Sequence, residues 1–170
     1  MAQALHRALI ATRLAVPFLL GLVLAVLSFV PYGSPDLSIV MPSLTLPLVF
    51  YWSLHRPEAM PFWAAFVIGL WQDILVGGSL GLMALLLVLA RGLVDNQRQV
   101  LLTQSFAIVW LVFAVASGLL TALAWVVAGL WWNHAFAVMP FFVHWGLGVA
   151  VYVPLAMGFR RLDQLLYEQA

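Results

Sequence analysis

The chain has 170 residues, of which 65% are hydrophobic and 8% are charged, with seven arginines and no lysine. So few polar residues cannot cover the surface of a soluble globular protein. The composition therefore predicts an all-α integral membrane protein with a single membrane domain over residues 1–170. The absence of cysteine excludes disulfides, thiol nucleophiles and thiolate metal sites.

Uncharged stretches give the expected transmembrane helices, since about 20 apolar residues are needed to cross a hydrocarbon core of roughly 30 Å. In chain order they predict six spans, over residues 14–32, 37–54, 59–76, 80–94, 103–130 and 137–159. The end segments 1–13 and 160–170 carry leucines on one helical side. We expect these two segments to lie along the membrane interface.

The arginines predict the orientation of the chain. They precede the first span, lie between the second and third and between the fourth and fifth, and follow the sixth: Arg7, Arg13, Arg56, Arg91, Arg98, Arg160 and Arg161. Short loops rich in basic residues stay on the cytoplasmic side. We therefore expect both termini in the cytoplasm and the loops near Asp36, Gly78 and Asn133 on the outer side.

Prolines single out the second span, which we expect to be kinked or partly unwound. Pro42 and Pro47 both lie in it, and an interior proline removes one backbone hydrogen bond. Freed carbonyls persist in a membrane only where neighbouring helices or water satisfy them. Two interpretations stay open at this point, a bend packed against a neighbouring helix and a cavity lined by this segment.

Small residues at a spacing of four predict surfaces for close contact between helices. Three such rows are present, formed by Gly21 with Ala25, by Ala114, Gly118 and Ala122, and by Gly146 with Ala150. The spacing leaves open whether each row packs inside the bundle or against another protein.

Asp73 is the most informative polar residue within the predicted spans. It lies four residues before Gly77, about 6 Å inside the outer end of its helix. A carboxylate at that depth needs a partner, water or a proton. Either Asp73 is a functional group, with His144 as one candidate partner, or it bonds the turn between Gly77 and Leu80.

Neither a metal site nor an enzyme is indicated by the remaining polar residues. His134 and His144 lack a third ligand at a recognisable spacing. The spans contain no pair of acids and no nucleophile beside a base. We expect no cofactor.

One run of residues carries a family resemblance. It consists of Gly69, Leu70, Trp71, Gln72 and Asp73, followed by Leu80 and Gly81. The pattern G-L-x-x-D-x-x-x-x-x-x-L-G resembles the signature of the MreD family of rod shape-determining proteins. The resemblance covers about residues 31–95.

This resemblance implies a non-enzymatic scaffold of the rod complex, or elongasome, in the bacterial inner membrane, where it supports peptidoglycan synthesis and cell shape. The implied partners are the bitopic protein MreC and, indirectly, MreB, RodA and its transpeptidase, besides membrane lipid. No nucleic acid is expected. In this interpretation Gly69, Asp73, Gly77, Leu80 and Gly81 belong to the outer hairpin of the third and fourth spans, and small residues facing lipid dock a helix of the partner.

Three other interpretations remain. The family is remotely similar to the six-helix substrate-binding subunits of energy-coupling factor transporters, so the chain is alternatively a small-solute-binding subunit. The second span with Pro42 and Pro47, together with Asp73 and His144, would then line an outward pocket. A polyprenyl lipid carrier would need an outward apolar cleft, and a hydrolase would need a catalytic group that the sequence does not offer.

Overall fold

The computed structural model describes residues 2–28, 43–77, 80–132 and 138–167, and these ranges contain helices and no strand. The all-α prediction is therefore confirmed for this part of the chain. The six helices are α1 (Ala2–Leu27), α3 (Thr45–His55), α4 (Phe62–Val76), α5 (Leu82–Leu101), α6 (Phe106–Trp132) and α7 (Val138–Tyr167).

Two of these helices are long and apolar enough to cross a membrane, over Phe106–Leu130 and Met139–Leu165. Shorter apolar stretches are found over Ala15–Leu27 and Phe62–Val76. Helix α3 has 11 residues, which corresponds to about 16 Å, and residues 29–42 before it lie outside the described part. The prediction of six crossings thus stays a prediction.

The helix ends differ from those expected. No break separates an interfacial segment from a span, because α1 is continuous from Ala2 and α7 is continuous to Tyr167. Helix α5 continues to Leu101, past the predicted end of the fourth span at residue 94. Arg91, which we counted among the arginines between the fourth and fifth spans, lies inside this helix and is 5% exposed. The sequence prediction ended α5 too early because it stopped the span before the first cluster of charged residues.

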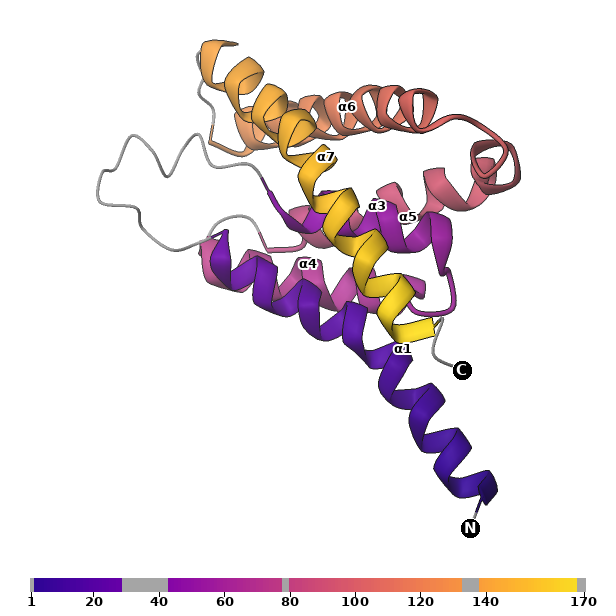
Figure 1. Ribbon diagram of the computed structural model, residues 1–170. Helices are drawn as coiled ribbons and strands as arrows, with labels where there is room; N and C mark the ends of the chain where they lie inside the picture. Colours follow the sequence, from indigo (N-terminus) through magenta and orange to yellow (C-terminus); the bar gives the residue numbers. More distant parts are fainter. Residues whose placement is uncertain (1, 29–42, 78–79, 133–137, 168–170) are drawn as a thin grey trace.

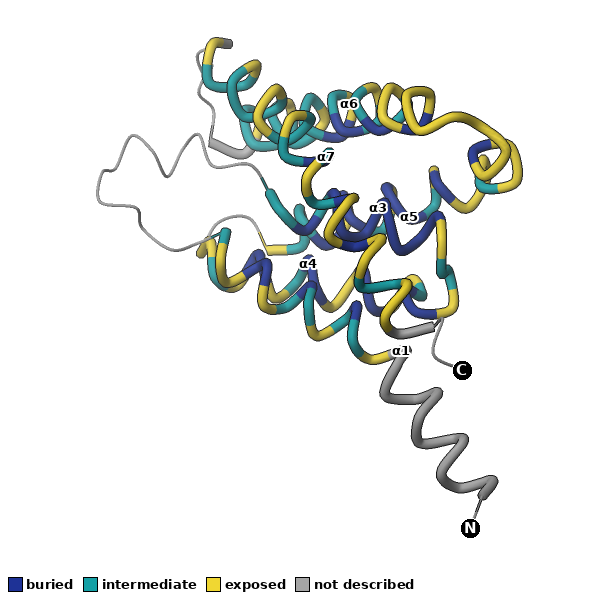
Figure 2. The backbone as a smooth tube through the Cα atoms, viewed as in Figure 1, coloured by how far each residue is buried: buried dark blue, intermediate teal, exposed yellow. Residues whose placement is uncertain are grey.

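Helix α3 lies at the centre of the core, and nine of its residues are buried. It contacts α1, α4, α5, α6 and α7. Helices α1 and α4 lie side by side below it, and α6 pairs with α7 on the other side (Figure 1). Buried residues concentrate in α3 and on the facing sides of α4 and α5, whereas much of α6 and α7 is exposed (Figure 2).

An aromatic cluster attaches the α6–α7 pair to α3. The rings of Phe113 and Tyr152 stack with centroids 4.2 Å apart, and Phe50 meets both edge-on at 5.1 and 5.9 Å. Such pairs are favoured by the aromatic quadrupole in addition to their packing. Tyr51 and Phe159 extend the attachment, with centroids 5.5 Å apart.

Two arginines of α5 tie it to the last turn of α3 and to the segment between α3 and α4. The Nε of Arg91 donates to the carbonyl oxygen of Met60 at 2.8 Å, and its guanidinium lies over the ring of Phe62, 4.8 Å from the centroid. The Nε of Arg98 donates to the carbonyl oxygen of Leu54 at 2.9 Å. Both bonds satisfy carbonyl oxygens that no helix satisfies.

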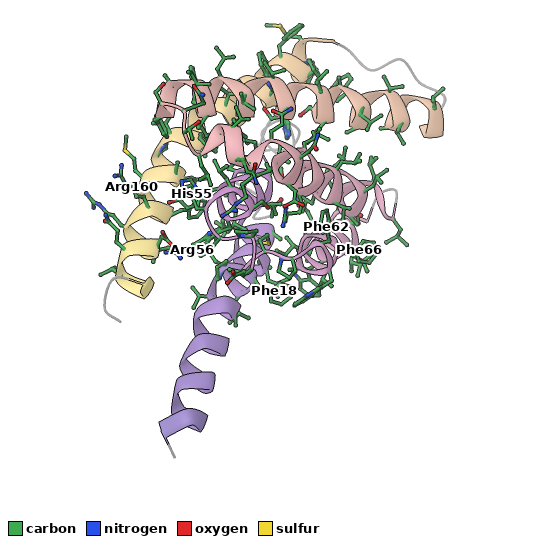
Figure 3. All side chains as sticks on the ribbon, turned by 90° about the vertical axis from the view of Figure 1, so that its right-hand side faces the viewer. Phe18, His55, Arg56, Phe62, Phe66 and Arg160 are labelled. Atoms are coloured by element: carbon green, nitrogen blue, oxygen red, sulfur yellow. The ribbon has the colours of Figure 1, made fainter. Side chains whose placement is uncertain are left out.

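A third arginine joins α3 to α7 at the same end of the bundle. The Nε of Arg56 donates to Oδ1 of Asp163 at 3.0 Å. Figure 3 is viewed toward this end and shows His55, Arg56 and Arg160 together beside α7. We call this the arginine end of the molecule, defined by Arg56, Arg91, Arg98 and Arg160.

Candidate functional site

Asp73 caps a helix to which it does not belong. It lies in the last turn of α4 and is 3% exposed. Its Oδ2 accepts from the backbone N–H groups of Gly81 at 2.9 Å and Ala84 at 3.3 Å, and its Oδ1 accepts from that of Met83 at 3.0 Å. These are free donors at the start of α5, which has no side-chain cap of its own. The positive end of the α5 dipole also favours a carboxylate there.

Two glycines shape the turn that brings Asp73 to these donors. Gly77 has φ 65° and Gly81 has φ 97°, in the left-handed region that residues with a Cβ adopt at a cost. The N–H of Gly77 donates to the carbonyl oxygen of Asp73 at 3.0 Å and so ends α4. The positions of the two glycines are thus explained by backbone conformation, since a Cβ at either would meet no other atom within 4 Å.

Gly69 is explained by contact instead of conformation. A Cβ placed on it would lie 2.6 Å from the backbone N of Ala84 and 2.7 Å from the backbone O of Met83, and would overlap the Cα of Ala84. The neighbouring atoms belong to the backbone of α5, so no side-chain rotation can relieve the overlap. Gly69 and Asp73 therefore contact the same turn of α5, one by close approach and one by hydrogen bonds.

Leu80 and the two prolines do not take part in the contact between Asp73 and the start of α5. Leu80 is 73% exposed, so it lies on the surface of the hairpin. Pro47 is the third residue of α3, where the backbone N–H has no partner in an α-helix, so proline fits there without breaking the helix. Pro42, and with it the expected kink before α3, lies outside the described residues.

A buried polar network beside Asp73 was not expected. Thr45 Oγ1 donates to Oε1 of Gln72 at 2.7 Å, and Nε2 of Gln72 donates to Oγ of Ser43 at 3.2 Å. The backbone N–H of Leu44 donates to Oγ of Ser28 at 3.3 Å. These bonds join the ends of α1, α3 and α4. The polarity of Gln72 within an apolar span was the available signal, but its partners are 27 and 29 residues away in the chain.

A cavity of about 360 Å³ lies between α3, α5, α6 and α7, at the end opposite the arginines. Pro47 and His144 line it, and Asp73 does not. Of the residues expected to line an outward pocket, Pro47 and His144 therefore do so. In the described part of the chain, Asp73 instead accepts hydrogen bonds from the start of α5 and does not bond to His144. Within the described ranges, no three metal-binding side chains come together.

Two of the three rows of small residues pack inside the molecule. A Cβ on Gly21 would meet Cδ1 of Ile68 at 2.5 Å. A Cβ on Gly118 would meet Nε1 of Trp145 at 3.1 Å, and Trp145 donates from that nitrogen to the carbonyl oxygen of Ala114 at 2.9 Å. Spacing alone did not show where these rows face, because it does not say which neighbour lies opposite.

The third row stays open on α7. Gly146 and Ala150 are exposed, and Pro154 and Gly158 continue the row at the same spacing and are also exposed. A Cβ on Gly146 or Gly158 would meet no atom within 4 Å. We call these four residues the α7 row.

The sequence matches the model of one protein family, described as rod shape-determining protein MreD, over residues 7–162. The match includes the Asp73 hairpin, the cavity and the α7 row. Curated proteins and solved structures show no significant match to the chain. Because the family match covers nearly all of the 170 residues, the chain belongs to the MreD family of rod shape-determining proteins.

Proposed function

We propose that the chain is a non-enzymatic scaffold of the rod complex that crosses the bacterial inner membrane six times. Membership of a family of shape-determining membrane proteins supports this role. Two helices can cross a membrane by length and composition, and the described ends of α1 and α7 lie on the same side of the molecule (Figure 1). The positive-inside rule assigns the arginine end to the cytoplasm, and both termini with it.

The proposed partner is an MreC-like bitopic protein, which docks its single transmembrane helix on the α7 row. Through it the scaffold would connect to MreB, RodA and the transpeptidase that works with RodA, and so support side-wall peptidoglycan synthesis. The single observation that carries this proposal is that the α7 row is open whereas the other two rows are filled from within. Small residues let two helix backbones approach closely, and close approach drives association in lipid.

The Asp73 hairpin has a supporting role in this proposal. Its bonds hold α4 against α5, and α5 in turn contacts α6, which packs against α7. The hairpin thus fixes the framework on which the α7 row is presented. In this proposal the hairpin does not contact the partner, and it affects partner binding only because it keeps the protein folded.

The experiment compares two substitutions of alanine by leucine at exposed positions. Ala150→Leu inserts a large side chain into the α7 row, and Ala107→Leu makes the same change on the exposed side of α6. Each tagged variant replaces the native protein in its own cells and is purified in a gentle detergent. We expect Ala150→Leu to lose most of the co-purifying MreC-like protein and to give rounded cells, because the larger side chain separates the two helices.

Ala107→Leu is expected to retain both the partner and the rod shape, which controls for expression and insertion. Equal recovery of the partner with the two variants would show that α7 does not form the interface. Recovery of paired ATPases instead of an MreC-like protein would remove the scaffold proposal altogether.

The alternative of a small-solute-binding subunit is favoured by one observation, the cavity. Its walls offer few polar groups to orient a water-soluble ligand, because His144 is the one ionisable side chain among the described lining residues and Asp73 is not among them. Native mass spectrometry of the purified protein would reveal a vitamin-sized ligand if this alternative were correct.

A further inference from the structure

The cavity between the α6–α7 pair and helices α3 and α5 has walls suited to a hydrocarbon. Its volume of about 360 Å³ corresponds to about a dozen water molecules at ~30 Å³ each. Most of its lining is apolar, including Leu86, Leu120 and Ala124. An empty space of this size forfeits packing contacts, and an apolar space does not hold ordered water well. An apolar molecule is therefore the occupant that its walls favour.

The hydroxyl hydrogens at the cavity wall are already used within the protein. Thr121 and Ser117 each donate to a carbonyl oxygen of α6, at 2.7 and 3.1 Å. Thr45 gives its only hydroxyl hydrogen to Gln72, so Ser43 is the donor in its 2.8 Å bond with Thr45. These hydroxyls have no hydrogen left for a polar ligand.

Among the described residues, the charge distribution does not favour recognition of an anionic headgroup. His144 is the one ionisable side chain among the described residues that line the cavity. Phosphate and diphosphate groups are bound in proteins by arginine, lysine or clustered backbone N–H groups. Arg56, Arg91 and Arg98 instead bond to groups at the opposite end of the bundle. If the occupant is a lipid, the cavity therefore selects its hydrocarbon chain and not its headgroup.

The extent of the cavity matches one leaflet of a bilayer. Its lining residues on α6 run from Phe113 to Ala128, and on α7 from Pro140 to Gly148. At 1.5 Å per residue these stretches are about 22 and 12 Å long, one longer and one shorter than the ~15 Å of half a ~30 Å hydrocarbon core, so the cavity is closer in depth to one leaflet than to the whole bilayer. Both helices are long and apolar enough to cross the membrane, so the cavity adjoins the hydrocarbon region.

We propose that this cavity binds one acyl chain of a bilayer phospholipid in the leaflet opposite the arginine end. The headgroup stays at the membrane interface, where the protein does not select it. The acyl chain fills the space that the aromatic cluster leaves between the α6–α7 pair and α3. It thereby stabilises the attachment of the pair to α3. This site is separate from the α7 row, so its test does not depend on partner binding.

The test uses the full chain in vesicles of phosphatidylcholine whose acyl chain carries a terminal diazirine, with crosslinked residues mapped by mass spectrometry. We expect labels on Thr121 and Ala124 as well as on residues that face the surrounding lipid. Ala124→Phe fills the cavity and should lower labelling of Thr121 several-fold. Val126→Phe on the same helix should leave it unchanged, because Val126 is 61% exposed and does not line the cavity.

A second measurement keeps the test valid if Ala124→Phe fails to fold. Adding phosphatidylcholine to delipidated protein should raise the unfolding temperature of the wild type and of Val126→Phe, and raise that of the milder cavity variant Ala128→Leu much less. Equal stabilisation of all three would overturn the proposal. Labels confined to residues outside the cavity would do the same.

Two further outcomes would assign the cavity to a different occupant. A polyprenyl phosphate carrying the same diazirine should not outcompete phosphatidylcholine, and preferential labelling by it would show headgroup recognition that we do not expect. Crosslinks from photoreactive residues at positions 121 and 124 to a co-expressed MreC-like protein, with none to lipid, would make the cavity a protein-binding site.

Discussion

Helices α3, α4 and α5 differ from the α6–α7 pair in how their neighbours are specified. The first group is held by bonds that involve backbone groups, from Asp73 to the start of α5 and from Arg91 and Arg98 to carbonyl oxygens. The α6–α7 pair is attached to α3 chiefly by aromatic rings, among them Phe113 and Tyr152. In the most apolar windows of α6 and α7, 22% and 11% of residues are buried.

The difference reflects the lengths of the helices. A short, central helix such as α3 leaves the polar backbone groups of its ends inside the protein, and other protein groups must satisfy them. Helices α6 and α7 satisfy most of their backbone groups internally, so side-chain packing contributes more to their position, besides the tryptophan bonds within the pair and the Arg56–Asp163 ion pair. The first group should therefore respond to single atomic changes more strongly than the second.

The largest effect should come from Gly69→Val, which places side-chain atoms against the backbone of Ala84. Overpacking against a backbone that cannot move prevents the α4–α5 contact, so we expect almost no folded protein to accumulate. Gly92→Ala is the control, because its Cβ would lie 3.8 Å from Phe62 in ordinary contact. Folded yield after detergent extraction measures both, and normal yield of Gly69→Val would contradict the close approach.

Phe113→Ala should have the next effect and tests the attachment of the α6–α7 pair. Phe113 is 1% exposed and stacks on Tyr152, and truncating a buried phenylalanine costs about 3–5 kcal/mol. Spin labels at exposed positions of α4 and α6 should report a broader distance distribution. A control at Phe142, which is 56% exposed, should show no broadening after the same change.

Asp73→Asn should destabilise the hairpin by a smaller amount. The amide can accept through one oxygen only, so at least one of the three backbone donors loses its partner, and a hydrogen bond to a charged group contributes roughly 1.5–3 kcal/mol. Unfolding in denaturing detergent measures the loss. Glu58→Gln is the control, since Glu58 is an exposed acid outside the hairpin. An equal effect of the two changes would argue against the capping role.

Arg56→Gln should have the smallest effect. The side chains of Arg56 and Asp163 are 43% and 20% exposed, and partly exposed ion pairs contribute about 0–1 kcal/mol. The loss should shrink further as salt is added, because ions screen the pair. A loss of several kcal/mol, unchanged by salt, would mean that Arg56 has a structural role like that of Arg91.

The sequence predicted the helical class, the approximate place of the helices and the family. It predicted fewer of the contacts, for reasons that individual residues make clear. Bonding of Asp73 to the adjacent hairpin could be named as one of two alternatives, because the backbone N–H groups that donate to its carboxylate lie within eleven residues. The partners of Gln72 and Arg98 are 27 and 44 residues away, so no local pattern reports them. The helical period placed Gly146 and Ala150 on one face but could not show that this face is open or that Pro154 and Gly158 continue it.

The arginines of α5 connect two properties that are usually treated separately. In the proposed orientation, Arg91 and Arg98 help to retain one side of the protein in the cytosol during insertion. The same guanidinium groups close the polypeptide segments around Leu54 and Met60. Moving these charges to invert the protein in the membrane would therefore also unpair those segments. The direction of insertion and the folded state are encoded by the same side chains, and a redesign must change both together.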